Sequence, residues 1–173
     1  MLGRPGTDSA TPVEVVGIAN AVAIDAGNNH VCALRATGRI ACWGRNRNGN
    51  LGDTDLADHP TPFEVPSVTG ALAVCAGDFF TCARLATGVV CWGTPASGRL
   101  GNPDADPDGD LVQAEPVPVI GLPPIVRLVC GGNHVCGRTA TGDLYCWGQG
   151  SSGQLGDGLG TSRAMPAPVL GFP

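Results

Sequence analysis

The sequence has no lysine, a single tyrosine and no long hydrophobic run, and these absences exclude several classes of protein. All 10 basic residues are arginines, and the 15 acidic residues bring the net charge to -5 with no basic stripe. Nucleic acid is therefore a poor partner, because its binding needs clustered cations. No apolar stretch approaches the roughly twenty residues that span a bilayer. With 3 histidines and no G-x-S-x-G motif, the chain also gives little support to an enzyme.

Glycine and proline are abundant instead, with 27 and 15 copies spaced between short apolar runs. This punctuation is typical of many short strands joined by turns. Residues 1–5 lack the charged leader and apolar core of a signal peptide. We expect, however, that the chain begins in the middle of a repeat.

One repeat occurs three times, and a repeat of this length predicts a fold more strongly than local propensity does. Its copies cover residues 23–53, 73–102 and 127–157, and a linker with proline precedes each copy. The copies align at Gly27, Gly77 and Gly131, and again at Trp43, Trp92 and Trp147. We expect an outer strand and linker from a preceding repeat in residues 1–20, then structural units at 21–70, 71–125 and 126–173.

Each copy is predicted to form four short strands. The segment Ala-Thr-Gly recurs between the second and third strands, and its glycine (Gly38, Gly88 or Gly142) suits the left-handed position of a hairpin loop. The linker supplies a fourth strand, whose prolines fit an outer edge where no ladder donor is required. Four antiparallel strands per repeat are typical of a β-propeller blade. The predicted fold is therefore all-β, a β-propeller with three blades present.

Three short motifs make the repeat specific. The first and third copies contain Gly-x-x-His, Trp-Gly and Gly-x-Leu-Gly-Asp, with His30, His134, Asp53 and Asp157 at the motif ends. The second copy departs from this pattern at Phe80 and Asn102. In these motifs the chain resembles the regulator-of-chromosome-condensation family, in a bacterial, secreted form with paired cysteines. The resemblance implies a structural role for the motif histidine and a ring that usually has seven blades, so that three blades are incomplete by themselves.

Six of the 8 cysteines form a repeated pair: Cys32 with Cys42, Cys82 with Cys91, and Cys136 with Cys146. If the first hairpin closes around Gly38, Cys32 lies directly opposite Cys42, and the same count applies around Gly142. Opposed residues in a non-hydrogen-bonded pair have the close spacing that a disulfide requires. Such bridges persist in oxidising compartments, so we expect an extracytoplasmic or secreted protein. The alternative is a cytosolic propeller in which these cysteines are small buried hydrophobes.

The other two cysteines, Cys75 and Cys130, have no counterpart in the first copy and occupy adjacent repeat positions. We expect them to be buried free thiols. Zinc is a further alternative for the paired cysteines, because His30-x-Cys32 and its counterpart in the third copy place two ligands on one strand face. Each blade then offers only three ligands, and Phe80 replaces the histidine in the second copy, so we expect no required cofactor.

An acidic stretch in the second unit matches the calcium-loop pattern D-x-D-x-D-G-x5-E. Its ligands would be Asp104, Asp106, Asp108, the backbone carbonyl of Asp110, and Glu115. Pro107 stiffens this loop and no helices flank it, both of which count against Ca2+. The alternative is a solvated acidic loop at the edge of a blade.

Phe79 and Phe80 are adjacent aromatic residues at the turn between the first two strands of the second unit. Such turns line one face of a propeller, so these side chains could anchor a protein partner. The alternative is that at least one of them packs inside the blade.

The sequence therefore predicts a non-catalytic, protein-binding propeller scaffold. Two other functions stay open: a secreted inhibitor of a hydrolase, in which Phe79 and Phe80 would be exposed, and a guanine-nucleotide exchange or chromatin-binding propeller. The cysteine pairs and the acidic balance count against the last. Incomplete rings expose apolar end blades, so we expect either self-association, most simply a dimer that builds a six-blade ring, or marginal stability.

Overall fold

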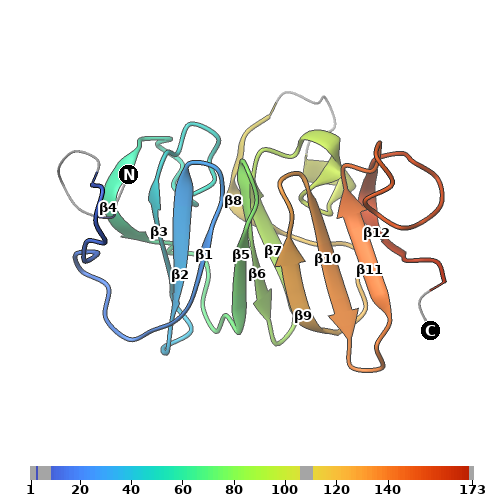
Figure 1. The fold of residues 1–173 in the computed structure, drawn as a ribbon, viewed down its shortest axis with the longest axis horizontal. Coiled ribbons are helices and arrows are strands. Elements are labelled where there is room, and N and C mark those ends of the chain that lie inside the picture. The colour runs from blue at the N-terminus through green and yellow to red at the C-terminus, as the bar shows by residue number, and fades with distance from the viewer. Residues whose placement is uncertain (1–2, 4–8, 106–110, 172–173) are drawn as a thin grey trace.

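The computed structural model describes residues 3, 9–105 and 111–171, which form three four-stranded antiparallel sheets (Figure 1). Blade 1 contains β1 (Ala21–Ala26), β2 (His30–Arg35), β3 (Ile40–Gly44) and β4 (His59–Glu64). Blade 2 contains β5 (Ala73–Ala76), β6 (Phe80–Leu85), β7 (Gly88–Gly93) and β8 (Gln113–Pro118). Blade 3 contains β9 (Ile125–Cys130), β10 (His134–Thr139), β11 (Leu144–Gly148) and β12 (Arg163–Pro168). Two short 3-10 turns, η1 (Ala96–Gly98) and η2 (Pro103–Ala105), precede β8.

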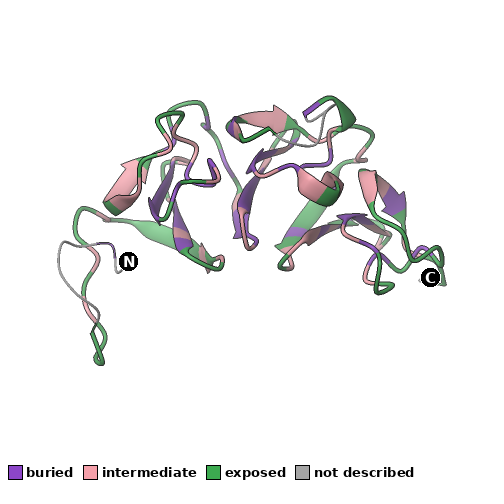
Figure 2. Ribbon diagram, turned by 90° about the horizontal axis from the view of Figure 1, so that it is seen from above, coloured by how far each residue is buried: buried purple, intermediate pink, exposed green. Residues whose placement is uncertain are grey.

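The predicted all-β architecture with three blades is confirmed. Figure 2 shows the blades side by side in an arc, and buried residues lie on their strands. Two clusters of buried side chains fill the spaces between the blades, one between blades 1 and 2 and the other between blades 2 and 3. The core of the protein therefore lies between the sheets, and each blade depends on its neighbours.

Turn glycines set the register of the central hairpins. Gly38 has a φ of 76°, and its amide donates to the Arg35 carbonyl at 2.9 Å, which closes the β2–β3 loop. In blade 2 this loop is shorter, because Leu85 pairs directly with Gly88. Cys82 and Cys91 are 9 residues apart, whereas the other two pairs are 10 apart. The shorter loop accounts for this difference, so the register of the strands is the same in all three blades.

The glycine of the Gly-x-x-His motif makes room for the ring that follows it. A Cβ atom added at Gly27 would overlap the imidazole of His30, and one added at Gly77 would overlap the ring of Phe80. Gly131 stands in the same relation to His134. The planar ring therefore requires that the residue beneath it, three positions earlier, has no side chain. Either phenylalanine or histidine can supply this ring.

At the junction of blades 1 and 2 this ring makes a polar contact. His30 Nε2 lies 2.9 Å from Thr81 Oγ1, and the Thr81 hydroxyl donates to the Asn50 carbonyl at 2.8 Å. Because the hydroxyl proton is used in that bond, Thr81 accepts from His30, which places the imidazole proton on Nε2. Trp92 Nε1 donates to the same Asn50 carbonyl at 3.0 Å.

The junction of blades 2 and 3 uses apolar side chains at the same positions. Phe80 replaces the histidine and Val135 replaces the threonine, and both are fully buried in one cluster. Trp147 Nε1 donates to the Arg99 carbonyl at 3.1 Å, as Trp92 does to Asn50. One geometry therefore accepts two matched pairs, a histidine with a hydroxyl or a phenylalanine with an aliphatic side chain.

The six paired cysteines stand opposite one another, and the structure joins each pair. Their Cα–Cα distances are 4.1 Å in blades 1 and 2 and 4.2 Å in blade 3, the close spacing of a non-hydrogen-bonded pair.

The expectation of free thiols at Cys75 and Cys130 is wrong in this structure, which joins the two residues across the junction of blades 2 and 3 at a Cα–Cα distance of 5.5 Å. Cys75 shares the face of blade 2 that carries Cys82, whereas Cys130 pairs with Val135 on the facing side of blade 3. Strand side chains alternate between faces, so residues that meet across a junction must occupy repeat positions an odd number apart. The one-residue offset is therefore the reason that the two cysteines meet.

A polar contact occupies the equivalent place between blades 1 and 2. Asp25 stands two residues before its motif glycine, as Cys75 does, and its carboxylate accepts from the Ala76 amide at 3.0 Å. The residue at this position thus reaches the next blade at both junctions.

We expect Cys75→Ala with Cys130→Ala to lower the free energy of unfolding more than Cys136→Ala with Cys146→Ala. The reason is loop length: closing 55 residues instead of 10 restricts the unfolded chain more, with chain-entropy values of about 4 and about 3 kcal/mol. Denaturant unfolding measures the difference, and peptide mapping without reductant should show four bridges. A free thiol at Cys75 or Cys130 in protein from its native compartment would contradict the interblade bridge.

We also expect stability to fall as the pH drops from about 6.5 to about 4. Burial lowers the pKa of His30 from 6.5 to about 4, although nearby Asp25 opposes the shift. The unfolded chain therefore binds a proton in this window that the folded chain excludes, which costs about 3 kcal/mol in total. Above pH 6.5 this loss is absent.

The matched control is His30→Phe with Thr81→Val, which copies the Phe80 and Val135 junction. Urea unfolding at a series of pH values should show a smaller loss of stability on acidification for this double variant than for the unaltered protein. Identical pH profiles would show that His30 is not the group responsible.

Candidate protein-binding face

The loops at one end of the blades form the candidate binding surface, here called the loop face. It comprises the turns at 27–29, 77–79 and 131–133 and the described parts of the loops at 45–58, 94–112 and 149–162, which lie at the upper edge of Figure 1. Each turn is tied to the following loop by one backbone hydrogen bond. The donors are the amides of Arg45, Thr94 and Gln149, and the acceptors are the carbonyls of Asn29, Phe79 and Asn133, at 2.8–2.9 Å. Rigid blades therefore hold six loop segments next to one another.

The expected partner-binding pair divides in the structure. Phe80 is fully buried against Gly77 and in the cluster between blades 2 and 3, so the expectation that it contacts a partner is wrong. Its position on a strand face that meets the next blade is the physical reason. Phe79 is partly exposed at the turn, and for this residue alone the contact role stays a prediction.

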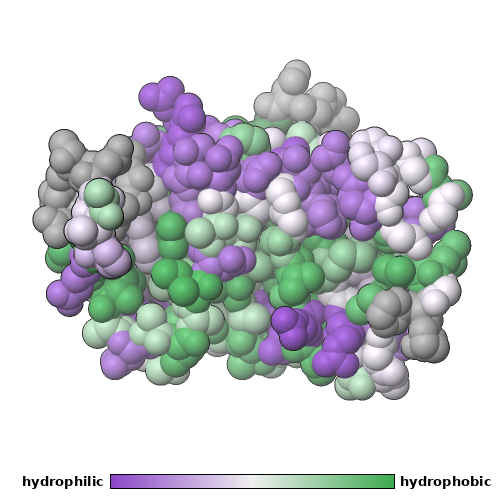
Figure 3. Space-filling model, viewed as in Figure 1, coloured by the Kyte–Doolittle hydropathy of each residue, from purple (hydrophilic) through white to green (hydrophobic). Residues whose placement is uncertain are grey.

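Hydrophilic residues gather along the loop face, whereas hydrophobic residues lie over the strands (Figure 3). Arg45, Arg47 and Asp55 are exposed there, and Asp78 is partly exposed. Arg99 is different: it is buried in the loop after η1, where its Nε donates to the Ala96 carbonyl at 2.7 Å. Burial lowers the pKa of Arg99, although nearby Asp78 opposes the shift. The exposed arginines are therefore the cations that a partner can reach.

Two aspartates of the β3–β4 loop and the histidine that begins β4 form a group that was not predicted from the sequence. One ligand atom from each of Asp53, Asp55 and His59 lies within 4.8 Å of the others, and His59 Nε2 is 2.8 Å from Asp53 Oδ2. Blade 3 has the same contact six residues apart, between Arg163 and Asp157. Because an arginine takes the place of the histidine in blade 3, we interpret both contacts as links that hold the loop to the outer strand. The repeated spacing of an acid and a base was the signal in the sequence.

The zinc alternative finds no support among the described residues. The structure joins Cys32 to Cys42, and the Nε2 atom of His30 already contacts Thr81. In blade 3, Cys136 is joined to Cys146 in the same way. The sulfur atoms that a metal would need are bonded to each other in disulfides.

The calcium-loop prediction falls largely outside the described residues, which exclude Asp106, Asp108 and Asp110. Of the two described ligands, Asp104 is exposed in η2 and Glu115 is exposed in β8. The site therefore stays a prediction. Within the described part of the chain, no helix is long and apolar enough to cross a membrane.

Two family models of the regulator of chromosome condensation (RCC1) repeat match this chain, and each begins at a different point of the repeat. One matches residues 21–50 and 125–154, and the other matches residues 37–84 and 141–173. Human E3 ubiquitin-protein ligase HERC2 is 35% identical over 91 residues, which are 49% of this chain and 2% of that protein. Human RCC1 domain-containing protein 1 is 29% identical over 187 aligned positions, which cover 86% of this chain and 50% of that protein. The chain thus spans no more than half the length of either relative.

Solved structures show the same fold. Yeast RCC1 (Prp20), in its complex with Kap60, superposes with a TM-score of 0.82 at 19% identity, over 96% of this chain and 41% of that chain. Human WBSCR16 gives a TM-score of 0.79 at 19% identity, over 96% of this chain and 44% of that chain. The profile matches span β1 to β6 and β9 to β12, where the motif glycines and rings make the contacts described above. This chain therefore belongs to the regulator of chromosome condensation repeat family.

Proposed function

We propose that this chain is a non-catalytic propeller module that binds another protein through its loop face in an extracytoplasmic compartment. The observation that carries the proposal is that some polar side chains make structural contacts, whereas others are exposed on the loop face. His30 is engaged in a contact between two blades, and His59 and Asp157 are engaged in contacts that hold a loop to an outer strand. Arg45 and Arg47, in contrast, are exposed on the loop face. Charged, exposed loops on a rigid scaffold are suited to recognition.

The related structures support protein binding as the kind of function. One contains yeast RCC1 (Prp20) bound to Kap60, and another study of Prp20p describes binding to Gsp1p and histones. Those partners are properties of Prp20. For this chain, the absence of lysine and the net charge of -5 count against chromatin.

The cysteine pairs support the extracytoplasmic part of the proposal. All eight cysteines are joined in four pairs, and bridges of this kind persist where the environment is oxidising. A hydrolase inhibitor is the second candidate, and the partial exposure of Phe79 at the rim of the loop face favours it. Burial of Phe80 leaves that candidate with a single aromatic anchor.

Replacing both exposed loop-face arginines, Arg45→Ala with Arg47→Ala, should weaken partner binding at least tenfold, which corresponds to about 1.4 kcal/mol. Crosslinking of the tagged chain in its host, followed by titration of the purified partner, measures the loss. The control is Arg127→Ala with Arg138→Ala, which removes two exposed arginines of blade 3 away from the loops. Equal weakening by the control, or none by either variant, would contradict binding through the loop face.

Calcium should bind the acidic loop between Asp104 and Glu115 and raise the melting temperature. Titration calorimetry with CaCl2 should show saturable heat that Asp104→Ala with Asp108→Ala abolishes. Asp53→Asn with Asp55→Asn should leave this heat unchanged, because it removes the carboxylates of the group between β3 and β4. No heat at millimolar calcium would identify the stretch as a solvated acidic loop.

A further inference from the structure

One face of blade 1 is open where the other junctions are closed. Ile24, Val74 and Leu128 each stand three residues before the motif glycine, but Ile24 is 64% exposed, whereas Val74 is 9% exposed and Leu128 is 8% exposed. Val31 is also partly exposed, although Thr81 and Val135 at its repeat position are fully buried. We call the surface that contains Ile24, Ala26, Val31 and Trp43 the open face of blade 1.

The outer border of a further junction is already present at this face. Gly3 lies against Val15 and the indole nitrogen of Trp43, as Gly52 lies against Val65 and that of Trp92. The Val16 amide donates to the Gly3 carbonyl at 3.1 Å, which repeats the bond from Leu170 to Gly156 at 2.8 Å. Residues 9–16 therefore take the place of an outer strand and linker, although no strand pairs with them in the described chain.

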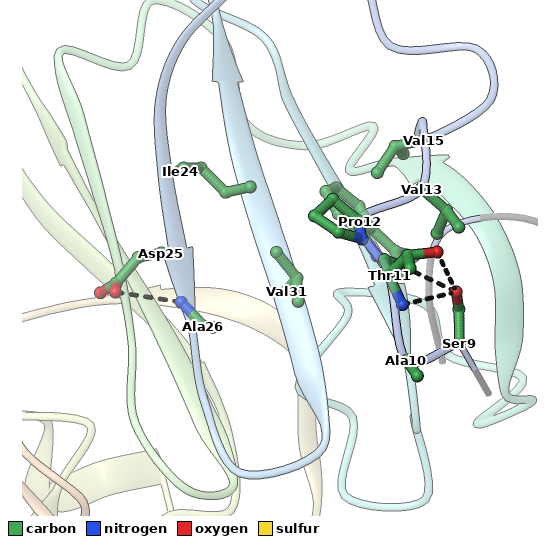
Figure 4. A pocket seen from close by; sticks show the side chains of 11 residues that line it. Ser9, Ala10, Thr11, Pro12, Val13, Val15, Ile24, Asp25, Ala26 and Val31 are labelled. Carbon is green, nitrogen blue, oxygen red and sulfur yellow. Dashed lines mark hydrogen bonds between the residues drawn. The ribbon is translucent and has the colours of Figure 1, made fainter.

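A groove of about 730 Å3 separates this segment from the open face. Figure 4 shows Ile24 and Val31 on the blade and Pro12, Val13 and Val15 on the segment opposite them. At the closed junctions, the inner strands of the neighbouring blade fill the corresponding space. The groove thus has the borders of a blade junction and continues the series of such junctions.

The chemistry of Val31 restricts the blade that can fill this groove. At the closed junctions, the ring residue of one blade meets either the hydroxyl of Thr81 or the aliphatic side chain of Val135. Val31 has no acceptor, so a histidine ring brought against it would bury an N–H group without a partner, which is unfavourable. A phenylalanine ring would reproduce the junction between blades 2 and 3.

A second copy of this chain does not meet these requirements. Blade 3 carries His134 at the ring position, which would face Val31 in a ring of two chains. Blade 3 also has its own outer strand, β12, which would compete with residues 9–16 for one place. Both conflicts disfavour the six-blade dimer expected from the sequence.

We propose that the open face of blade 1 binds the three inner strands of a further blade of the same repeat, and that Val31 selects a blade whose residue at the position of His30 is phenylalanine. The pair at each junction thereby determines which blades can be neighbours. Residues 9–16 supply the fourth strand of the blade that binds.

The test adds such a blade to the full chain. A second copy of residues 71–100, with Cys75→Ala in that copy, replaces residues 1–2, so that it continues into Gly3 as the natural repeat continues into Gly101. Four chains are compared: the added copy has either Phe80 or Phe80→His, and blade 1 has either Val31 or Val31→Thr. The two matched combinations are phenylalanine with valine and histidine with threonine.

Matched chains should melt about 2–4 °C higher than mismatched chains, the shift that a roughly fivefold change in the unfolding equilibrium constant gives at this chain length. The added segment should also resist limited proteolysis in the matched chains. Equal melting temperatures in all four chains would overturn the selection by Val31. Rapid cleavage of the added segment in all four would overturn the docking of a blade.

Light scattering on the unaltered protein tests the competing occupant. We expect a mass of 17.4 kDa at micromolar concentration, because a second copy is mismatched at Val31. A stable dimer that dissociates when Ile24→Glu is introduced would assign the open face to a second copy and overturn the proposal.

Discussion

The structure depends on the contact that each turn ring makes across a blade junction. A four-stranded blade has two apolar faces and cannot bury either one alone, so its stability comes from the neighbouring sheets. The ring of His30 or Phe80 lies on a glycine of its own blade and packs against the second strand of the next blade, which is β6 or β10. Because that position is fully buried, its partner must either accept the imidazole proton or be apolar. The glycine, the ring and the partner residue are therefore one unit, and a change in one requires a change in another.

The same junction logic explains the cysteines. A pair within a blade joins directly opposed residues of neighbouring strands, and in blades 1 and 2 this pair also belongs to the buried cluster at the following junction. Cys75 and Cys130 instead connect two blades, at the place where Asp25 accepts a backbone hydrogen bond at the preceding junction. At this repeat position, the junction of blades 2 and 3 has a disulfide, whereas the junction of blades 1 and 2 has a carboxylate that accepts a backbone hydrogen bond.

Several histidine and arginine side chains have structural roles, so the exposed loops are the place where we expect a partner to bind. His59 and Arg163 hold their outer strands to the aspartate of Gly-x-Leu-Gly-Asp, and Arg99 is buried beneath the loop face. The side chains left for recognition lie on turns and loops of the loop face, such as the exposed Arg45 and Arg47 and the partly exposed Phe79. A propeller of this kind can change its partner by changing loops without disturbing the junctions.

By itself the sequence determined the repeat, the four-stranded blades and the three cysteine pairs within them, because these follow from turns and strand registers only about ten residues apart. Only the tertiary structure decided which strand faces meet. That decision buried Phe80, brought Cys75 to Cys130 across 55 residues, and left Ile24 exposed although Val74 and Leu128 at the same position are covered. The physical reason is that alternation assigns a side chain to one of two faces, whereas its burial depends on whether another blade lies against that face.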